Sequence, residues 1–332
     1  MSNNATAVAE KEITTPPAAH ARNLALLAGI VAGIPLAALV VAFFVINTPI
    51  FKKYADSQTV SSQQFLFETK NQPCDILIFG DSTAMAGLDP SIVEGATHLR
   101  SCNIATNATT LGVMGMEPFS QYLTRNPRPK YLVLQFASQD LHEMKPETAH
   151  LDHFDGVILS MRYKSWSDTY PLFLHNPDYF IGLMNYVYRT GIPQLVSNLR
   201  HSAKDAGRRD SYFVVPRPAL KSCALFASEP AMPDPVWVQT LRQRYAGAAD
   251  HLIVDVSPTS SCNTLYPQWK SSLGNATDNS LELYPNNLFV DGSYHTSREG
   301  AIRRSNELAQ QILGMEQQKP ETPAGSAKAL SQ

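Results

Sequence analysis

A long segment without charges places the strongest constraint on how this chain can fold. No charged residue occurs from Asn23 to Phe51, and Leu24 to Val45 consists almost entirely of Leu, Ala, Val, Ile, Gly and Phe. A helix needs ~20 apolar residues to cross a bilayer, and the single Pro35 is compatible with such a helix. The segment 23–48 therefore predicts a transmembrane anchor.

Two properties separate this segment from a cleaved secretory signal, whose apolar core usually has ~7–15 residues. The run is longer than that, and it lacks a clear small-x-small cleavage site before Lys52. Its flanks do not orient it, because Lys11 and Arg22 precede it while Lys52 and Lys53 follow it. These residues leave the side of the membrane open.

A buried strand followed by a Gly-Asp-Ser turn is predicted to open the folded domain. Four apolar residues, 76–79, run directly into Gly80-Asp81-Ser82, and residues 84–93 are typical of a turn that enters a helix. Ser82 is thus expected at the carboxyl edge of a sheet, where ligands bind in open α/β folds. There its N–H group and the helix dipole would face an oxyanion formed beside the hydroxyl. The alternative is that Ser82 only caps a helix.

An acid and a histidine lie close together near the other end of the chain. Asp291 and His295 fall just before a predicted helix over residues 298–313. A serine early in the chain, followed late by an acid and a histidine, is an order that can assemble a nucleophile, a base and an orienting carboxylate. The alternative for His295 is a buried histidine bonded to the backbone.

These two motifs resemble those of the SGNH (GDSL-type) hydrolase superfamily, whose members carry Gly-Asp-Ser after the first strand and Asp-x-x-His before the last helix. The resemblance covers roughly residues 73–313. Within the superfamily, the chain most resembles membrane-anchored envelope proteins that transfer or remove acyl groups, because of the apolar segment that precedes the domain. It implies no metal or other cofactor. It also implies a set of site residues, namely Ser82, Asp291 and His295 as catalytic groups, with Ser82, Asn107 and Gln139 forming the oxyanion hole.

The chain departs from the family pattern at three points. Asn107-Ala108 stands where the family has a glycine donor, and Gln139 stands at the asparagine position of the family's Gly-x-Asn-Asp. The acid and the histidine are four residues apart rather than three, because Tyr294 is extra. A missing oxyanion donor costs ~10²–10³ in turnover. The alternative for Gln139 and Asp140 is that they only end a strand.

Four predicted strands set the fold class as α/β. They begin at Asp75, Leu99, Tyr131 and His251, and helices or long connections separate them, as in a mainly parallel sheet with helices on both faces. With the resemblance, this predicts a three-layer α/β/α fold of the SGNH-hydrolase or flavodoxin-like type. The predicted organisation is a disordered tail (1–21), the anchor (23–48), a linker (49–72), the domain (73–315) with an insertion (141–246), and a disordered tail (316–332).

The insertion is rich in aromatic residues and irregular in pattern. Long irregular segments of this kind are often lids or binding loops, so we expect it to cover the mouth of the site, where aromatic faces suit sugar rings. The alternative is a satellite apolar core. The aromatic residues are Tyr163, Trp166, Tyr170, Phe173, Tyr179, Phe180, Tyr186 and Tyr188.

Composition excludes some classes and leaves others open. The net charge of −2 gives no reason to expect nucleic acid as a partner. The four cysteines, at 74, 102, 223 and 262, have no C-x-x-C spacing, so no zinc site is predicted. Two disulfides, one or none are compatible with the sequence, a Cys223–Cys262 pair among them.

The sequence predicts a membrane-anchored, serine-dependent O-acyltransferase or esterase. Its substrates would be acyl esters, acetyl esters foremost, of cell-envelope carbohydrate or lipid, and the reaction would pass through an acyl-serine. The resemblance further implies a domain outside the cytoplasm, periplasmic or extracellular, and a membrane protein that donates the acyl group. The alternative is a binding protein of the same fold for an envelope glycan, without catalysis.

Overall fold

The computed structural model describes residues 17–56, 58–143, 154–201, 211–215, 217–223, 231–292 and 294–318. Most of the two predicted tails lies outside these residues. Helix α1 (Pro17–Asn47) and helix α14 (Arg298–Gln317) each extend a few residues into the predicted tail ranges.

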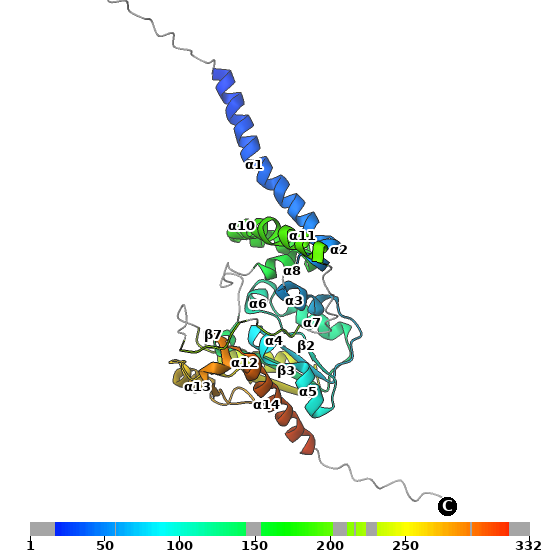
Figure 1. Cartoon of the computed structure of the whole chain (residues 1–332), viewed down its shortest axis with the longest axis vertical. Coiled ribbons are helices and arrows are strands. Elements are labelled where there is room, and N and C mark those ends of the chain that lie inside the picture. Colours follow the sequence, from blue (N-terminus) through cyan, green and yellow to red (C-terminus); the bar gives the residue numbers. More distant parts are fainter. Residues whose placement is uncertain are drawn as a thin grey trace, which may run out of the picture.

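A parallel four-stranded sheet lies at the centre of the domain, as predicted (Figure 1). Its spatial order is β2-β1-β3-β4, and each neighbouring pair is parallel. The strands are β1 (Ile76–Gly80), β2 (Ser101–Asn103), β3 (Tyr131–Phe136) and β4 (His251–Val256). The mixed α/β class is therefore confirmed.

Apolar side chains cover both faces of the sheet. Every residue of β1 and β3 is buried. Leu77 and Phe79 belong to a large apolar cluster, whereas Ile76 and Ile78 belong to a second one. Because successive side chains of a strand point to opposite faces, a continuous apolar run supplies both clusters, which is typical of parallel strands.

The order of the strands places a switch point between β1 and β3. From β1 the chain first adds β2 on one side and later adds β3 on the other, and ligands bind at such points in open α/β sheets. The two strands approach closely here: a Cβ at Gly80 would lie 1.7 Å from the carbonyl oxygen of Gln135. Only glycine can occupy this position.

Short polar side chains cap the helices that follow the strands. Asp81, Asn107 and Ser297 accept hydrogen bonds from backbone N–H groups in the first turn of α4, α6 and α14. The helices around the sheet are α4 (Ser82–Gly87), α5 (Pro90–Thr97), α6 (Ala108–Met114), α7 (Glu117–Arg125), α12 (Pro235–Tyr245), α13 (Tyr266–Leu273) and α14. Two short strands, β5 (Thr259–Ser260) and β6 (Leu283–Tyr284), pair beside them.

Helix α1 contains one stretch, Ala21–Asn47, that is long and apolar enough to cross a membrane. Ala42 and Ile46 in its last turns are buried against the domain. The segment expected as a linker forms two more helices, α2 (Pro49–Tyr54) and α3 (Gln58–Glu68), with Phe51 and Leu66 in the large apolar cluster. The apolar side chains of this segment therefore pack into the core of the domain.

The part of the insertion from residue 155 to residue 201 is helical and lies beside the N-terminal helices. It comprises α8 (Asp155–Tyr163), α9 (Trp166–His175), α10 (Asp178–Met184), the π-helix η3 (Asn185–Gly191) and α11 (Ile192–His201). Helices α8, α10 and η3 contact α1, and α11 contacts α2 (Figure 1). The aromatic residues that were expected over the mouth of the site all lie in this part. Residues 211–215 and 217–223 of the insertion instead approach the site, where the Phe213 N–H donates to the Met85 carbonyl at 3.4 Å and Arg217 Nη1 lies 3.6 Å from Asp291 Oδ2. Residues 144–153, 202–210, 216 and 224–230 of the insertion lie outside the described residues.

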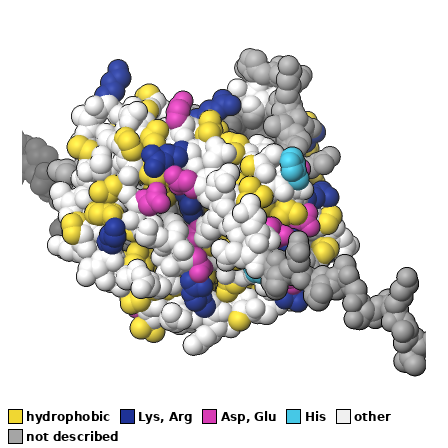
Figure 2. All heavy atoms as spheres, turned by 90° about the horizontal axis from the view of Figure 1, so that it is seen from below, with side chains coloured by type: hydrophobic (Ala, Val, Ile, Leu, Met, Phe, Trp, Pro, Cys, Tyr) yellow, Lys and Arg dark blue, Asp and Glu magenta, His cyan; other side chains and the backbone are white. Residues whose placement is uncertain are grey.

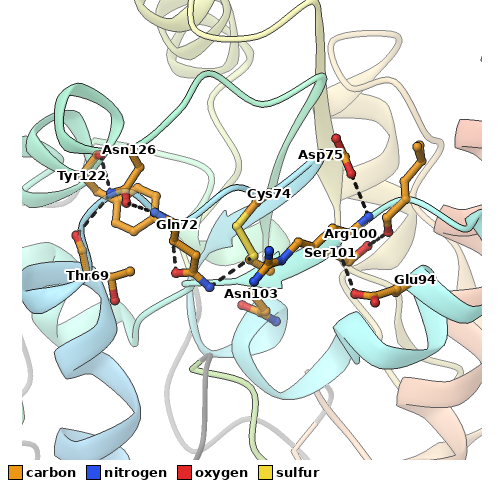
Figure 3. Close-up of a disulfide and its surroundings, with 12 residues drawn as sticks. Thr69, Gln72, Cys74, Asp75, Glu94, Arg100, Ser101, Asn103, Tyr122 and Asn126 are labelled. Atoms are coloured by element: carbon orange, nitrogen blue, oxygen red, sulfur yellow. Dashed lines mark hydrogen bonds between the residues drawn. A yellow bond between two sulfur atoms is a disulfide. The ribbon is translucent and has the colours of Figure 1, made fainter.

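Two disulfides resolve the question that the cysteine spacing left open. Cys74 at the start of β1 is bonded to Cys102 in β2, and Cys223 is bonded to Cys262. The first bond lies in a polar setting in which Gln72 contacts both Cys102 and Asn126 (Figure 3). It closes the amino end of the pair β1–β2.

Candidate active site

The three residues predicted as a catalytic triad lie together at the carboxyl edge of the sheet. His295 Nε2 lies 2.8 Å from Ser82 Oγ. His295 Nδ1 lies 3.0 and 2.8 Å from the two carboxylate oxygens of Asp291. An imidazole that donates from Nδ1 to Asp291 has Nε2 available to accept the serine proton. The His295 and Asp291 side chains are 20% and 23% exposed, so both are open to solvent.

A tight hairpin explains why a spacing of four residues suits this pair. The hairpin is formed by β7 (Phe289–Asp291) and β8 (His295–Thr296), and Asp291 lies opposite His295 in the antiparallel register. Residues opposite each other carry their side chains on the same face. Gly292 in the turn has a φ of +40°, a conformation that favours glycine. The extra residue is thus absorbed by the turn, and the acid still meets the imidazole.

Asp81 fixes the segment that carries Ser82 by hydrogen bonds. It is fully buried, and its Oδ1 accepts hydrogen bonds from the N–H and hydroxyl of Thr83 at 2.8 and 2.6 Å. Its Oδ2 accepts one from the N–H of Ala137 at 2.7 Å, which joins the carboxyl ends of β1 and β3. Thr83 in turn contacts the Ser257 hydroxyl at 2.5 Å, just after β4. The aspartate of the Gly-Asp-Ser turn is therefore a positioning residue, a role that the sequence analysis did not assign.

A second carboxyl group contacts Asp81. Asp140, in the 3₁₀-helix η1 (Ser138–Asp140), shares a hydrogen bond with it. Burial, and then the neighbouring charge of Asp81, raise the pKa of the Asp140 carboxyl well above its usual range. Asp140 therefore keeps its proton to a higher pH than an exposed aspartic acid does. Asp81 is buried at the carboxyl end of β1, and Asp140 follows the carboxyl end of β3, so the two acids lie beside Ser82.

Tyr294 and Arg217 flank the acid and the histidine. The Tyr294 ring meets the His295 ring edge-on, with centroids 4.5 Å apart. Burial, followed by the charges of Asp291 and Asp140, raises the pKa of the Tyr294 phenol, so it stays neutral. Arg217 Nη1 lies 3.6 Å from Asp291 Oδ2, but it is largely exposed, so this attraction is weak. No local sequence pattern marks Arg217, which comes from a distant part of the chain.

The two side chains predicted as further oxyanion donors are not joined to the triad. Asn107 caps α6: its Oδ1 accepts from the N–H of Thr110 at 2.7 Å, and its Nδ2 donates to Asp155 at 3.3 Å. Gln139 lies in η1. Among the described residues, no hydrogen bond links either side chain to Ser82 or His295. Of the predicted donors, the backbone N–H of Ser82, at the start of α4, is the one that lies next to the Ser82 hydroxyl.

A buried ion pair holds α14 against the sheet. Arg304 donates to Asp255 on β4 at 2.5 Å and to Gln135 on β3 at 2.8 Å, and both charged side chains are almost fully buried. Helix α14 starts two residues after β8, so this pair also fixes the hairpin that carries His295. The sequence offers one signal for this ion pair, namely Asp255 within a mainly apolar strand, because a buried charge needs a partner of opposite charge.

The described residues form a cavity away from Ser82 and hold no group of side chains suited to a metal ion. No group of three or more His, Cys, Asp or Glu side chains that could hold a metal ion is found among them. A cavity of about 600 Å³ is lined by Gln72, Asp75, Glu94, Arg100 and Cys102, among others. These residues surround the first disulfide at the amino end of β1 (Figure 3), whereas Ser82 follows the carboxyl end.

The site therefore holds a hydroxyl, an imidazole and a carboxylate in one hydrogen-bonded chain. The hydroxyl lies at a helix start, and a buried carboxylate braces its backbone. Comparison with protein-family models, with curated proteins and with solved structures gives no match. We therefore infer the function from the geometry of the site.

Proposed function

We propose that this protein is a serine-dependent O-acyltransferase or esterase that works through an acyl-serine. The observation that carries the proposal is the hydrogen-bonded chain from Ser82 through His295 to Asp291, with contacts of 2.8 Å on each side of the imidazole. A capping serine needs no imidazole at its hydroxyl. A histidine that served packing alone would not join a serine to a carboxylate.

The chemistry follows from the positions of the protons. His295 Nε2 takes the hydroxyl proton while Ser82 Oγ attacks the carbonyl carbon of an acyl ester. The oxyanion accepts a hydrogen bond from the Ser82 N–H. When the ester bond breaks, the alcohol leaves with the proton from His295 and the acyl group stays on Ser82. Asp291 stabilises the imidazolium that exists between these two transfers.

The second half of the reaction decides between an esterase and a transferase. His295 removes a proton from water or from a sugar hydroxyl, which attacks the acyl-serine and restores the free hydroxyl. The anchor-like α1 and the resemblance to envelope enzymes favour acetyl esters of envelope carbohydrate or lipid, with a domain outside the cytoplasm and a membrane protein as donor. We further propose the three-layer α/β/α arrangement of SGNH hydrolases, supported by the apolar clusters on both sheet faces.

The test uses the full chain in detergent, because the end of α1 is part of the core. The protein is incubated with an activated acetyl ester, and its intact mass is measured beside Ser82→Ala and Ser91→Ala, the latter an exposed serine on α5. An acetyl-sized gain in the wild type and Ser91→Ala alone, faster to decay with added sugars than with water, supports a transferase. Decay that sugars do not accelerate supports an esterase.

No gain in any of the three proteins, with the fold intact by circular dichroism, would refute catalysis. The second candidate, a glycan-binding protein of the same fold, would then be favoured. Its specific support is that Asn107 and Gln139 make no hydrogen bond to the triad among the described residues.

A further inference from the structure

One end of the molecule carries a group of exposed apolar side chains that the proposed chemistry does not use. They lie on α9, α10, η3 and α11, and we call them the apolar collar. Its members are Trp166, Tyr170, Leu174, Ile181, Tyr188 and Val196, which are 39–61% exposed. Outside α1 and α2, the other exposed large apolar residues of the described chain are spread over separate elements: Val214, Met232, Val236, Leu283 and Ile302.

The opposite end of the molecule has a different surface. Seen from below, charged side chains of both signs are interspersed with apolar ones (Figure 2). Such a mixture is ordinary for a surface in water, whereas grouped apolar side chains mark a contact. The collar therefore requires an occupant.

The collar is continuous with the exposed surface of α1. The rings of Phe43 and Trp166 meet edge-on at 5.8 Å between centroids, and the Tyr188 hydroxyl donates to the Ala38 carbonyl at 3.5 Å. Helices α10 and α11 run crosswise to α1 at this level (Figure 1). The helices of the collar thus lie as a layer around the last turns of α1.

The length of α1 shows where this layer would lie relative to a bilayer. From Asn23, which follows the last charged residue before the helix core, to Ala38 there are about 15 residues, or ~22 Å at 1.5 Å per residue. The hydrocarbon core is ~30 Å thick. Crossing it takes ~20 residues, which reaches Phe43. Lipid must therefore extend along α1 to the level where Trp166 and Tyr188 contact it.

We propose that α9, α10, η3 and α11 lie in the membrane interface, with the apolar collar toward the acyl chains of the lipids. This rests on the proposed anchoring by α1. Trp and Tyr suit that depth, because their rings are apolar and their polar tips reach the headgroups. The occupant is the bilayer itself, since the surface that α1 exposes continues into the collar.

A buried ion pair makes this attachment rigid. Arg162 on α8 donates to both carboxylate oxygens of Asp56 at 2.7 Å and to the Ile46 carbonyl of α1 at 3.1 and 2.8 Å. Both charged side chains are at most 1% exposed. The last turn of α1 is thereby fixed to the domain, so the collar helices and the anchor form one body that seats the domain against the membrane.

The first test is fluorescence of the full chain in phosphatidylethanolamine/phosphatidylglycerol vesicles that contain lipids brominated at shallow or deep positions. Vesicle flotation reports the anchor separately. We expect quenching by the shallow label, loss of the quenched emission in Trp166→Phe, and no loss in Trp237→Phe on α12. Protein that floats but whose quenching is unchanged in Trp166→Phe would overturn the collar, whatever the result of the Ser82 acylation test.

The second test uses a nitroxide at position 181 or 236. All four native cysteines are in disulfides, so Ile181→Cys and Val236→Cys each offer one free thiol at a residue that is 59% or 69% exposed. In vesicles, we expect the label at 181 to be relaxed by oxygen more than by a water-soluble nickel complex, and the reverse at 236. The proposal would be overturned if the labels at 181 and 236 were equally accessible to oxygen and to the nickel complex. It would also be overturned if the label at 181 became accessible to the nickel complex when the protein is diluted in lipid. The second result would assign the collar to another copy of the chain.

Discussion

Replacing Arg162 by Met is expected to destabilise the protein by an amount that depends strongly on pH. The substitution removes the positively charged partner of Asp56 and the donor to the Ile46 carbonyl. Burial already raises the pKa of Asp56 against the lowering effect of Arg162. Without the guanidinium, the folded protein has its lowest free energy with the Asp56 carboxyl group protonated.

The size of this effect follows from the proton. The unfolded chain releases it with a pKa of about 3.9, so keeping it in the folded state costs ~1.36 kcal/mol per pH unit above that value. The cost is ~4 kcal/mol at pH 7 and ~1.5 kcal/mol at pH 5, and the orphaned Ile46 carbonyl adds ~1 kcal/mol at either pH. The sign is fixed, because the folded variant binds more protons than the unfolded chain and stability must fall as pH rises.

The assay is denaturant unfolding of the full chain in a mild detergent at pH 5 and pH 7. Arg189→Met, at an exposed arginine of η3, is the matched control and should change stability little at either pH. The double variant Asp56→Asn/Arg162→Met should recover most of the loss at pH 7, because no charge is left unpaired. A destabilisation by Arg162→Met that is the same at both pH values would refute the reasoning.

Three further predictions concern the site and the disulfides. Asp291→Asn should lower the rate of acyl-serine formation by ~10³–10⁴, because the imidazole loses its orienting acceptor; a burst rate within tenfold of wild type would contradict this. Asp140→Asn should lose less stability between pH 5 and pH 8 than wild type does. In wild type the raised pKa of Asp140 gives stability that is fully present below ~pH 4 and is lost as the carboxyl group of the folded protein ionises. Melting temperatures that fall equally with pH in both proteins would exclude this. Replacing both Cys74 and Cys102 by Ala should cost ~3–4 kcal/mol for a loop of this length, and an unfolding midpoint equal to that of wild type would show that the bond does not constrain the unfolded chain.

Features set by short stretches of sequence were predictable. The apolar run before Gly80 forms a strand because each of its side chains has a buried face to occupy, and the four predicted strands appear in the sheet. The helix at 298–313 and the apolar stretch of α1 follow in the same way from local periodicity and length. The residue types of the triad could be named, since few side chains can act as nucleophile and base.

Other features needed the folded chain. Ser82 and His295 are 213 positions apart, so their contact depends on the sheet order and on the hairpin that sets Asp291 opposite His295. The contact between Asp140 and Asp81 likewise depends on the fold, because it needs the end of β3 beside the end of β1.

The insertion shows most clearly the difference between what the sequence predicts and what only the folded chain decides. Its aromatic content was visible in the sequence, but composition does not say which surface a segment covers. The helices between residues 155 and 201 pack on α1 and α2 and share one apolar cluster with them. That pairing is decided by burial across the whole molecule. By itself the sequence determined the chemistry that the residues can perform and the local elements they form; the tertiary structure alone decided which of those residues meet, because contacts between distant segments depend on how the core closes.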